Sequence, residues 1–145
     1  MATRQASILA WIHLLHVHHK VQRCETAHLA KYNLTLPQFD VLAQLNREEG
    51  ITQQELAERL LVTKGNVCGL MDRLVEQGLV ERNTDPEDRR AYMLHLTPKG
   101  KELIETITPA HGQVIGEQLG VLDPEKQKQL LNLLAELDRK LDKEN

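Results

Sequence analysis

The sequence predicts a mainly α-helical chain with one β-hairpin, and three features of residues 51–100 support this fold class. Two segments with helical periodicity follow each other after a short break, and a glycine stands at the end of the second. Two short β-compatible runs then flank a turn rich in Asp and Arg. Helix, turn, helix and charged hairpin, in this order, indicate a winged helix-turn-helix with a two-stranded β wing.

The first of these helices is expected to begin near Thr52, which forms a capping-box pattern with Glu55. Its apolar residues recur on one helical face and are Leu56, Ala57 and Leu60. Residues 60–62 are apolar, and we expect them to close the helix and to begin the turn. The next helix therefore follows after a turn short enough for a helix-turn-helix.

The second helix is expected to begin at Thr63, because threonine is a good N-cap. Its buried stripe follows the i, i+3, i+4, i+7 spacing and consists of Val67, Leu70, Met71 and Leu74. Gly78 stands where a C′ glycine ends a helix.

The outward face of the second helix predicts contact with DNA. Its candidate residues are Thr63, Lys64, Gly65, Asn66, Gly69 and Arg73. Each interior glycine costs about 1 kcal/mol relative to alanine, which suggests that something approaches the backbone closely. Lysine can meet a phosphate, and asparagine can pair with adenine. The alternative is that Gly69 only admits a neighbouring helix.

The predicted hairpin consists of residues 79–84 and 90–96, and its alternating apolar positions are Tyr92, Leu94 and Leu96. Asp-Pro at residues 85–86 opens the turn. Asp88 is placed to orient an arginine by a charge-assisted hydrogen bond, and Arg89 and Arg90 follow it directly. An arginine held at a hairpin tip suits a narrow minor groove, whereas the alternative is a solvated polar loop.

The ends of the chain are expected to be helical. Residues 5–31 form one long helix that stops at Asn33, and Thr35 caps the next, which runs to about residue 48. Thr97 and Asp123, each followed by proline, begin the last two helices. A leucine stripe on the final helix consists of Leu130, Leu134, Leu137 and Leu141. Such a stripe needs a partner, so we interpret the terminal helices as a dimerisation layer; intramolecular packing is the alternative.

Several motifs of the chain occur together: LPQFDVL at 36–42, QELA at 54–57, DRL at 72–74 with GLV at 78–80, DPEDRR at 85–90 and LTPKG at 96–100. In this combination the chain resembles the MarR-type winged-helix transcription regulators. The resemblance implies a homodimer that binds double-stranded DNA at an inverted-repeat operator. It also implies that Arg90 is the minor-groove arginine and Asp88 its anchor. Such proteins are usually repressors that a small ligand, a metal or oxidation releases from DNA.

Length and composition suit one domain, residues 1–145, with a DNA-binding portion at about 34–100 and dimerisation portions at about 5–32 and 101–143. No apolar run approaches the ~20 residues of a membrane span, and no signal peptide is recognisable, so we expect a cytoplasmic protein without a membrane partner. The net charge of −3 argues against nonspecific coating of nucleic acid, but not against a specific DNA reader.

A small-molecule effector is the expected signal, bound between the winged helix and the dimerisation layer. Trp11, His13 and His16 are candidates for one wall of its pocket, and Asp40 and Arg73 for its charged groups. This Asp–Arg pair resembles the pair of family members that respond to aromatic anions such as urate. The alternative is a structural salt bridge inside the winged helix.

Metal sensing and redox sensing are alternative switches. The first helix carries His13, His16, His18, His19, Cys24 and His28, and a later helix carries His111. The pairs His13–His16, His16–His19 and Cys24–His28 have spacings that share a helix face and could hold zinc together with a ligand from another helix. A polar face with several imidazoles explains the same pattern, so we predict no metal and no cofactor. Cys24 and Cys68 are expected to be reduced, buried and inert.

Two other classes of protein compete with the DNA-binding regulator. An enzyme is not expected, because the sequence shows no nucleophile–base set, phosphate loop or HExxH pattern and therefore no catalytic residues. A winged helix used only for protein–protein contact is the better alternative. The wing favours DNA, since an interaction module does not need an Asp-anchored arginine at its tip.

Overall fold

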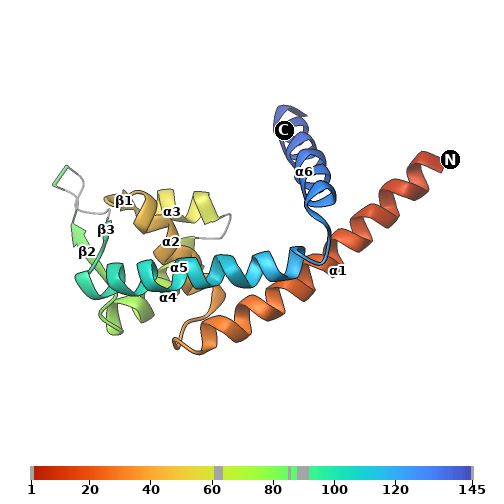
Figure 1. Cartoon of the computed structure of the whole chain (residues 1–145). Helices are drawn as coiled ribbons and strands as arrows, with labels where there is room; N and C mark the ends of the chain where they lie inside the picture. Colours follow the sequence, from red (N-terminus) through yellow and green to blue (C-terminus); the bar gives the residue numbers. More distant parts are fainter. Residues whose placement is uncertain (1, 61–63, 85, 88–91, 145) are drawn as a thin grey trace.

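The computed structural model describes residues 2–60, 64–84, 86–87 and 92–144. Its elements, in chain order, are α1 (Ala2–Ala30), α2 (Leu36–Arg47), β1 (Ile51–Thr52), α3 (Gln53–Leu60), α4 (Lys64–Glu76), β2 (Val80–Thr84), β3 (Tyr92–Leu96), α5 (Pro98–Leu119) and α6 (Pro124–Glu144). The fold is mainly helical, with a small antiparallel sheet at one end (Figure 1). The predicted fold class is confirmed.

Local capping signals place the boundary between α1 and α2. Asn33 adopts a positive φ of 57° after the end of α1, which is a conformation that asparagine tolerates better than most residues. The hydroxyl of Thr35 accepts a hydrogen bond from the backbone N–H of Gln38, and the Gln38 side chain accepts one from the N–H of Thr35. This reciprocal capping box begins α2 where the sequence predicted it.

The helix-turn-helix consists of α3 and α4. Thr52 Oγ1 accepts a hydrogen bond from the N–H of Glu55 at 3.1 Å and so caps the start of α3. At the end of α4, Gly78 has a φ of 73°, and the N–H of Leu79 donates to the carbonyl of Leu74 at 3.0 Å. This arrangement is a Schellman motif and confirms the predicted glycine stop. The predicted turn and its cap, Thr63, lie outside the described residues.

The sheet has three antiparallel strands in the order β1-β3-β2. The hairpin pairs Val80 with Leu96 and Thr84 with Tyr92. The third strand, β1, was not predicted: Ile51 pairs with Leu94 across the sheet. A strand of two residues is too short for alternation to reveal it, because its pairing depends on a segment distant in sequence.

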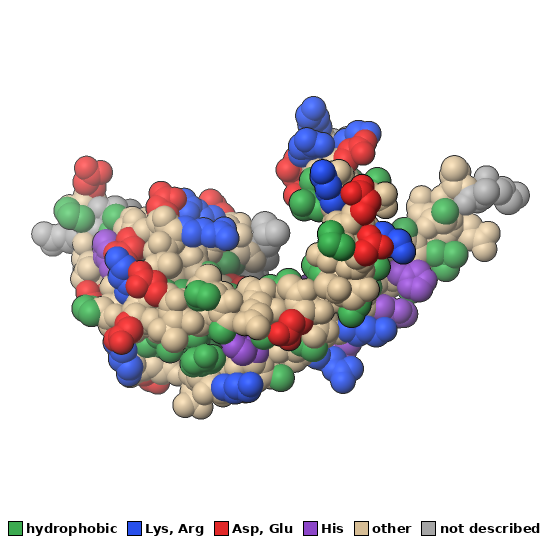
Figure 2. Space-filling model, in the orientation of Figure 1, with side chains coloured by type: hydrophobic (Ala, Val, Ile, Leu, Met, Phe, Trp, Pro, Cys, Tyr) green, Lys and Arg blue, Asp and Glu red, His purple; other side chains and the backbone are tan. Residues whose placement is uncertain are grey.

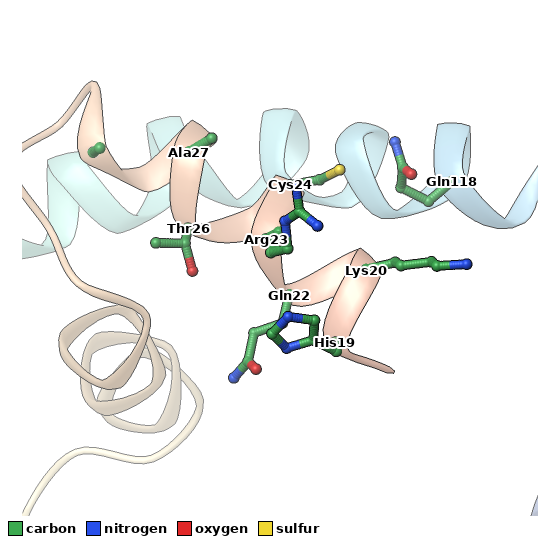
Figure 3. A pocket seen from close by; sticks show the side chains of 9 residues that line it. His19, Lys20, Gln22, Arg23, Cys24, Thr26, Ala27 and Gln118 are labelled. Atoms are coloured by element: carbon green, nitrogen blue, oxygen red, sulfur yellow. The ribbon is translucent and has the colours of Figure 1, made fainter. Parts of the chain in front are cut away.

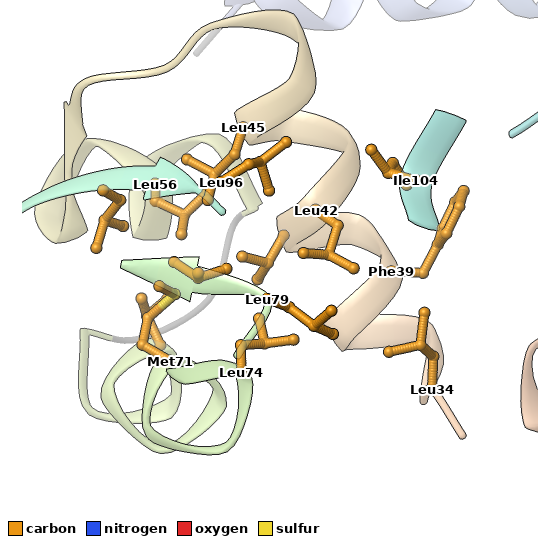
Figure 4. Packing of buried hydrophobic residues seen from close by; sticks show 14 of the residues in the cluster. Leu34, Phe39, Leu42, Leu45, Leu56, Met71, Leu74, Leu79, Leu96 and Ile104 are labelled. Atoms are coloured by element: carbon orange, nitrogen blue, oxygen red, sulfur yellow. The ribbon is translucent and has the colours of Figure 1, made fainter. Parts of the chain in front are cut away.

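One continuous core lies among α2, α3, α4, the sheet and the first half of α5 (Figure 4). Its fully buried side chains include Leu42, Leu45, Leu56, Val67, Met71, Leu74, Leu94 and Ile104. The predicted stripe of α4 is confirmed, although Leu70 is only partly buried. Tyr92 alternates with Leu94 and Leu96 along β3 as predicted, but its side chain is 45% exposed, because it lies at the outer end of the hairpin.

The start of α5 is attached directly to the end of the winged helix. Thr97 Oγ1 accepts a hydrogen bond from the N–H of Gly100 and donates one to the carbonyl of Gly78 at 2.6 Å. A Cβ on Gly100 would overlap the carbonyl of Leu79, so the close approach requires glycine. These contacts place the first turn of α5 firmly against the winged helix.

The N-terminal half of α1 and the whole of α6 extend away from the core (Figure 1). Both present exposed large hydrophobic side chains; those on α1 include Ile8, Trp11, Ile12 and Leu15, and those on α6 include Leu131, Leu134, Leu137 and Leu141. A groove of about 580 Å³ lies between the two helices and is lined mainly by apolar side chains. Within the described residues, no helix is long and apolar enough to cross a membrane.

Candidate nucleic-acid interface

The outer face of α4 carries the predicted DNA-contact residues that the structure describes. Asn66, Gly69 and Arg73 are exposed and share one face, whereas Val67 and Met71 are buried on the other. Lys64 and Gly65 form the first turn of α4, but their side-chain environment lies outside the description. Asp88, Arg89 and Arg90 also lie outside the described residues. The helix thus presents a polar surface on a rigid apolar base.

Gly69 lies at the centre of this surface. Apart from its chain neighbours and the nearby backbone of α4 itself, no described atom lies within 4 Å of the position that a Cβ would take there. The described part of the chain therefore provides no neighbouring helix that would explain the glycine. The open space leaves the backbone of α4 accessible to another molecule.

Two side chains, Arg82 and Gln53, hold the middle turn of α4 from both sides through three polar contacts. Arg82 on β2 donates through Nη2 to Asp72 Oδ1 at 2.6 Å and to the backbone carbonyl of Cys68 at 3.1 Å. From α3, Gln53 Nε2 donates to Cys68 Sγ at 3.2 Å. Sequence reasoning missed this connection, because it depends on the packing of β2 against α4. The i, i+4 spacing of residues 68 and 72 was the available signal.

The two cysteine side chains are less buried than the sequence predicted. Both are free, and both are half-buried. Cys24 lies on the side of α1 that faces α5 and lines an open hollow whose rim includes Lys20, Arg23 and Gln118 (Figure 3). Lys, Arg and His side chains gather along this part of the molecule (Figure 2).

The predicted effector residues do not come together in one pocket. Trp11 and His13 line the apolar groove between α1 and α6. His16 lies beside His13, with ring centroids 6.4 Å apart, but does not line the groove. Asp40 lies on α2, where Glu25 and His111 influence it electrostatically. Among the ion pairs of the described residues, none joins Asp40 to Arg73, so the alternative of a structural salt bridge has no support.

A polar cluster around the buried side chain of His111 connects α1, α2 and α5. His111 Nε2 lies 2.9 Å from Glu25 Oε2, and the His111 ring lies 4.3 Å from that of Phe39. The His28 ring is 5.8 Å from His111. Burial, and then the charge of Glu25, raise the pKa of Asp40. Sequence reasoning missed this cluster. The described residues contain no group of three or more His, Cys, Asp or Glu side chains that could hold a metal ion.

The pKa of His28 predicts how the free energy of unfolding of this protein changes with pH. Burial, followed by the neighbouring His111, lowers this pKa below its ordinary value of 6.5. The unfolded chain therefore takes up the proton first, and the stabilisation by neutral His28 is lost as the pH falls from 6.5 through the lowered pKa. We expect the His28→Asn variant to lose less unfolding free energy than the wild type between about pH 7.5 and about pH 5.

Urea unfolding at the two pH values measures this difference. The raised pKa of Asp40 acts with the opposite sign, since its stabilisation is lost as the pH rises through that pKa. His28 is not among the causes of the raised pKa of Asp40, so the contribution of Asp40 to the pH dependence of stability is the same in the wild type and in the variant. Equal losses in both proteins would contradict the prediction.

Comparison with known proteins agrees with this arrangement. The sequence model of the MarR family matches residues 32–91. The uncharacterised HTH-type transcriptional regulator YkoM of Bacillus subtilis (strain 168) is 37% identical over 97 residues, which are 67% of this chain and 63% of YkoM. The match thus spans less than two thirds of that relative's length.

Solved structures extend the likeness to most of the chain. A mutant of MarR from E. coli complexed with operator DNA has a TM-score of 0.81 and 31% identity, covering 90% of this chain and 95% of that chain. The transcriptional repressor CouR, bound to a 23-mer DNA duplex, has a TM-score of 0.83 and 28% identity, covering 92% and 95%. With its outward-facing α4 and its wing, the chain therefore belongs to the MarR family of winged helix-turn-helix regulators, which bind DNA and are not enzymes.

Proposed function

We propose that this protein is a homodimeric repressor that binds an inverted-repeat operator and is released by a small-molecule effector. The observation that carries the proposal is the outer face of α4. Asn66, Gly69 and Arg73 are exposed together there, and no described atom occupies the space over Gly69. Thr63, Lys64, Gly65, Asp88, Arg89 and Arg90 complete the proposed DNA-contact set.

A second copy of the chain is the proposed partner of α1 and α6. Trp11 is 59% exposed and Leu137 49% exposed in the single chain, and both line the same apolar groove. A soluble protein rarely leaves an apolar surface of this kind uncovered. A symmetric dimer through residues 5–32 and 101–143 would set two copies of α4 about one DNA turn apart, which matches half-sites with about 10 bp between their centres.

The proposed effector is a small molecule, and Trp11, His13, His16 and Asp40 stay predictions for its contacts. The groove between α1 and α6 supports Trp11 and His13 as apolar and hydrogen-bonding contacts. Asp40 lies apart from this groove, where Glu25 and His111 influence it electrostatically, so its proposed contact with the effector belongs to a different region of the chain.

Selection of random double-stranded DNA on the purified protein tests the proposed function. We expect an enriched inverted repeat, and an affinity for it that falls steeply as salt rises. The same DNA then serves as a probe for release by aromatic acids, metals and peroxide. If the folded dimer enriched no motif at low salt, the proposal would fail and the protein-interaction alternative would gain support.

Substitution of Gly69 by alanine separates DNA binding from stability. We expect the free energy of unfolding to rise by about 1 kcal/mol, since the helix gains propensity and the new Cβ has open space. Operator affinity should fall, because the methyl group keeps DNA away from α4. Gly112→Ala is the matched control: a Cβ on Gly112 of α5 also meets nothing within 4 Å.

Urea unfolding and fluorescence anisotropy measure the two effects in both variants. Similar operator affinities for the Gly69→Ala and Gly112→Ala proteins would show that DNA does not approach α4 at residue 69.

A further inference from the structure

We propose that Arg82 is a positioning residue: it fixes the orientation of α4 relative to the wing and so sets operator specificity, without itself contacting DNA. This inference rests on operator recognition as proposed above. It concerns three residues, Arg82 with its two acceptors at Asp72 and Cys68.

The two acceptors on α4 form a pair because of helix geometry. Residues 68 and 72 are one turn apart, so the carbonyl of Cys68 lies beside the carboxylate of Asp72 on one face. A helical carbonyl bonded within its own helix keeps a second lone pair, and Arg82 Nη2 uses that of Cys68 at 3.1 Å. The guanidinium therefore holds the backbone of α4 as well as one of its side chains.

The other end of this connection is fixed in the sheet. Arg82 pairs with Leu94 in the middle of the β2–β3 ladder, and Leu94 is fully buried. The Tyr92 ring lies 5.9 Å from the Arg82 guanidinium carbon and restricts the side chain further. Arg82 thus joins the central turn of α4 to the strands that carry the hairpin tip.

The turn held by Arg82 is the turn that presents Gly69. Gln53 holds the Cys68 side chain from α3, while Arg82 holds the Cys68 carbonyl from β2. With both contacts in place, α4 cannot tilt without breaking a hydrogen bond. A tilt would change the distance between the outer face of α4 and the hairpin tip, which must enter two adjacent grooves together.

The charge on Arg82 is already paired, which argues against direct contact with a phosphate. Its side chain is 24% exposed, and the Asp72 carboxylate lies 2.6 Å from it. Lysine would not replace it fully, because an ammonium is a point charge without the planar fork of a guanidinium.

The Asp72→Ala variant gives the sharpest test. Operator affinity should rise if Asp72 is only a surface charge, and should fall if Asp72 anchors Arg82. If Asp72 were only a surface charge, its removal would strengthen attraction to DNA. If it anchors Arg82, operator affinity should fall about tenfold, which is the effect of losing one charge-assisted hydrogen bond. Alanine favours the helix, so α4 itself should stay intact. Glu76→Ala is the matched control, since it removes the same charge from an exposed position one turn later on α4.

The Arg82→Gln variant distinguishes positioning from phosphate contact. If Arg82 is a positioning residue, its substitution by glutamine should lower operator affinity about tenfold and lower the affinity for scrambled DNA only a little. The slope of log affinity against log salt should then stay unchanged. A phosphate contact would weaken both DNAs alike and reduce that slope by about 1. Arg82→Lys should recover only part of the operator affinity.

Anisotropy titrations of the wild type and these variants at several salt concentrations measure these quantities, with thermal unfolding as a check that each variant is folded. Stronger operator binding by Asp72→Ala, or a lower salt slope for Arg82→Gln, would overturn the inference while the proposed function stands. A wild-type protein that distinguishes no DNA sequence would overturn both.

Discussion

Replacing Arg90 by glutamate is expected to abolish operator binding and to leave the dimer assembled. The chain between Thr84 and Tyr92, which pair at the end of the hairpin ladder, contains Arg90. A hairpin tip that carries an arginine suits a narrow minor groove, where the negative potential is strongest. Reversal of the charge replaces attraction by repulsion. We expect at least about a hundredfold loss of affinity, on the order of 3 kcal/mol.

Lys128→Glu is the matched control for Arg90→Glu. Both substitutions change the net charge equally, but Lys128 lies on α6, far from the wing (Figure 1). Anisotropy titration with the selected operator measures affinity, and light scattering measures the oligomeric state. If Arg90→Glu bound the operator as well as Lys128→Glu does, the proposed docking of the wing would be wrong.

Local signals were sufficient to predict most helix boundaries. Thr35 with Gln38, Thr97 before a proline, and Gly78 after the stripe of α4 act within one turn of the backbone that they cap. Their effect depends on neighbours in sequence, so the sequence contains the information directly. The buried stripe of α4 was predictable for the same reason, because its 3.6-residue period is a property of one helix.

Contacts between distant elements could not be predicted in the same way. Ile51 becomes a strand residue only because Leu94, far along the chain, offers its backbone. The charge of Arg82 was visible in the sequence, but not its contact with Cys68 and Asp72. Sequence spacing shows which residues share a helix face, whereas the packing of several elements decides what that face meets.

The candidate effector site shows the same limit. The prediction grouped Trp11 with Asp40, yet Asp40 is influenced by Glu25, which is further along α1 than Trp11. With a rise of 1.5 Å per residue, the distance along α1 between residues 11 and 25 is about 21 Å. Within a single copy of the chain, one small molecule is too short to contact both ends of that segment. Figure 1 shows α1 as one extended helix, so no bend brings residues 11 and 25 closer together.

The Leu134→Asp/Leu137→Asp variant is expected to separate the dimer and, with it, to remove high-affinity operator binding. Both side chains line the groove between α1 and α6. Burial of one leucine stabilises an interface by about 1.5–3 kcal/mol, and a carboxylate placed there adds a desolvation penalty. A symmetric dimer contains each substitution twice, so its dissociation constant should rise by at least about a thousandfold.

Asn132→Asp is the control for this variant, because Asn132 is an exposed polar residue of α6 outside the leucine stripe. Light scattering should show a monomer for the double variant and a dimer for the control. Each winged helix should stay folded, since the core cluster contains no described residue of α6. The monomer should then bind each half-site separately and weakly, because the second half-site no longer benefits from the high effective concentration that the dimer provides. A double variant that stays dimeric would show that another surface joins the two copies, and the assignment of α6 to the dimerisation layer would fail.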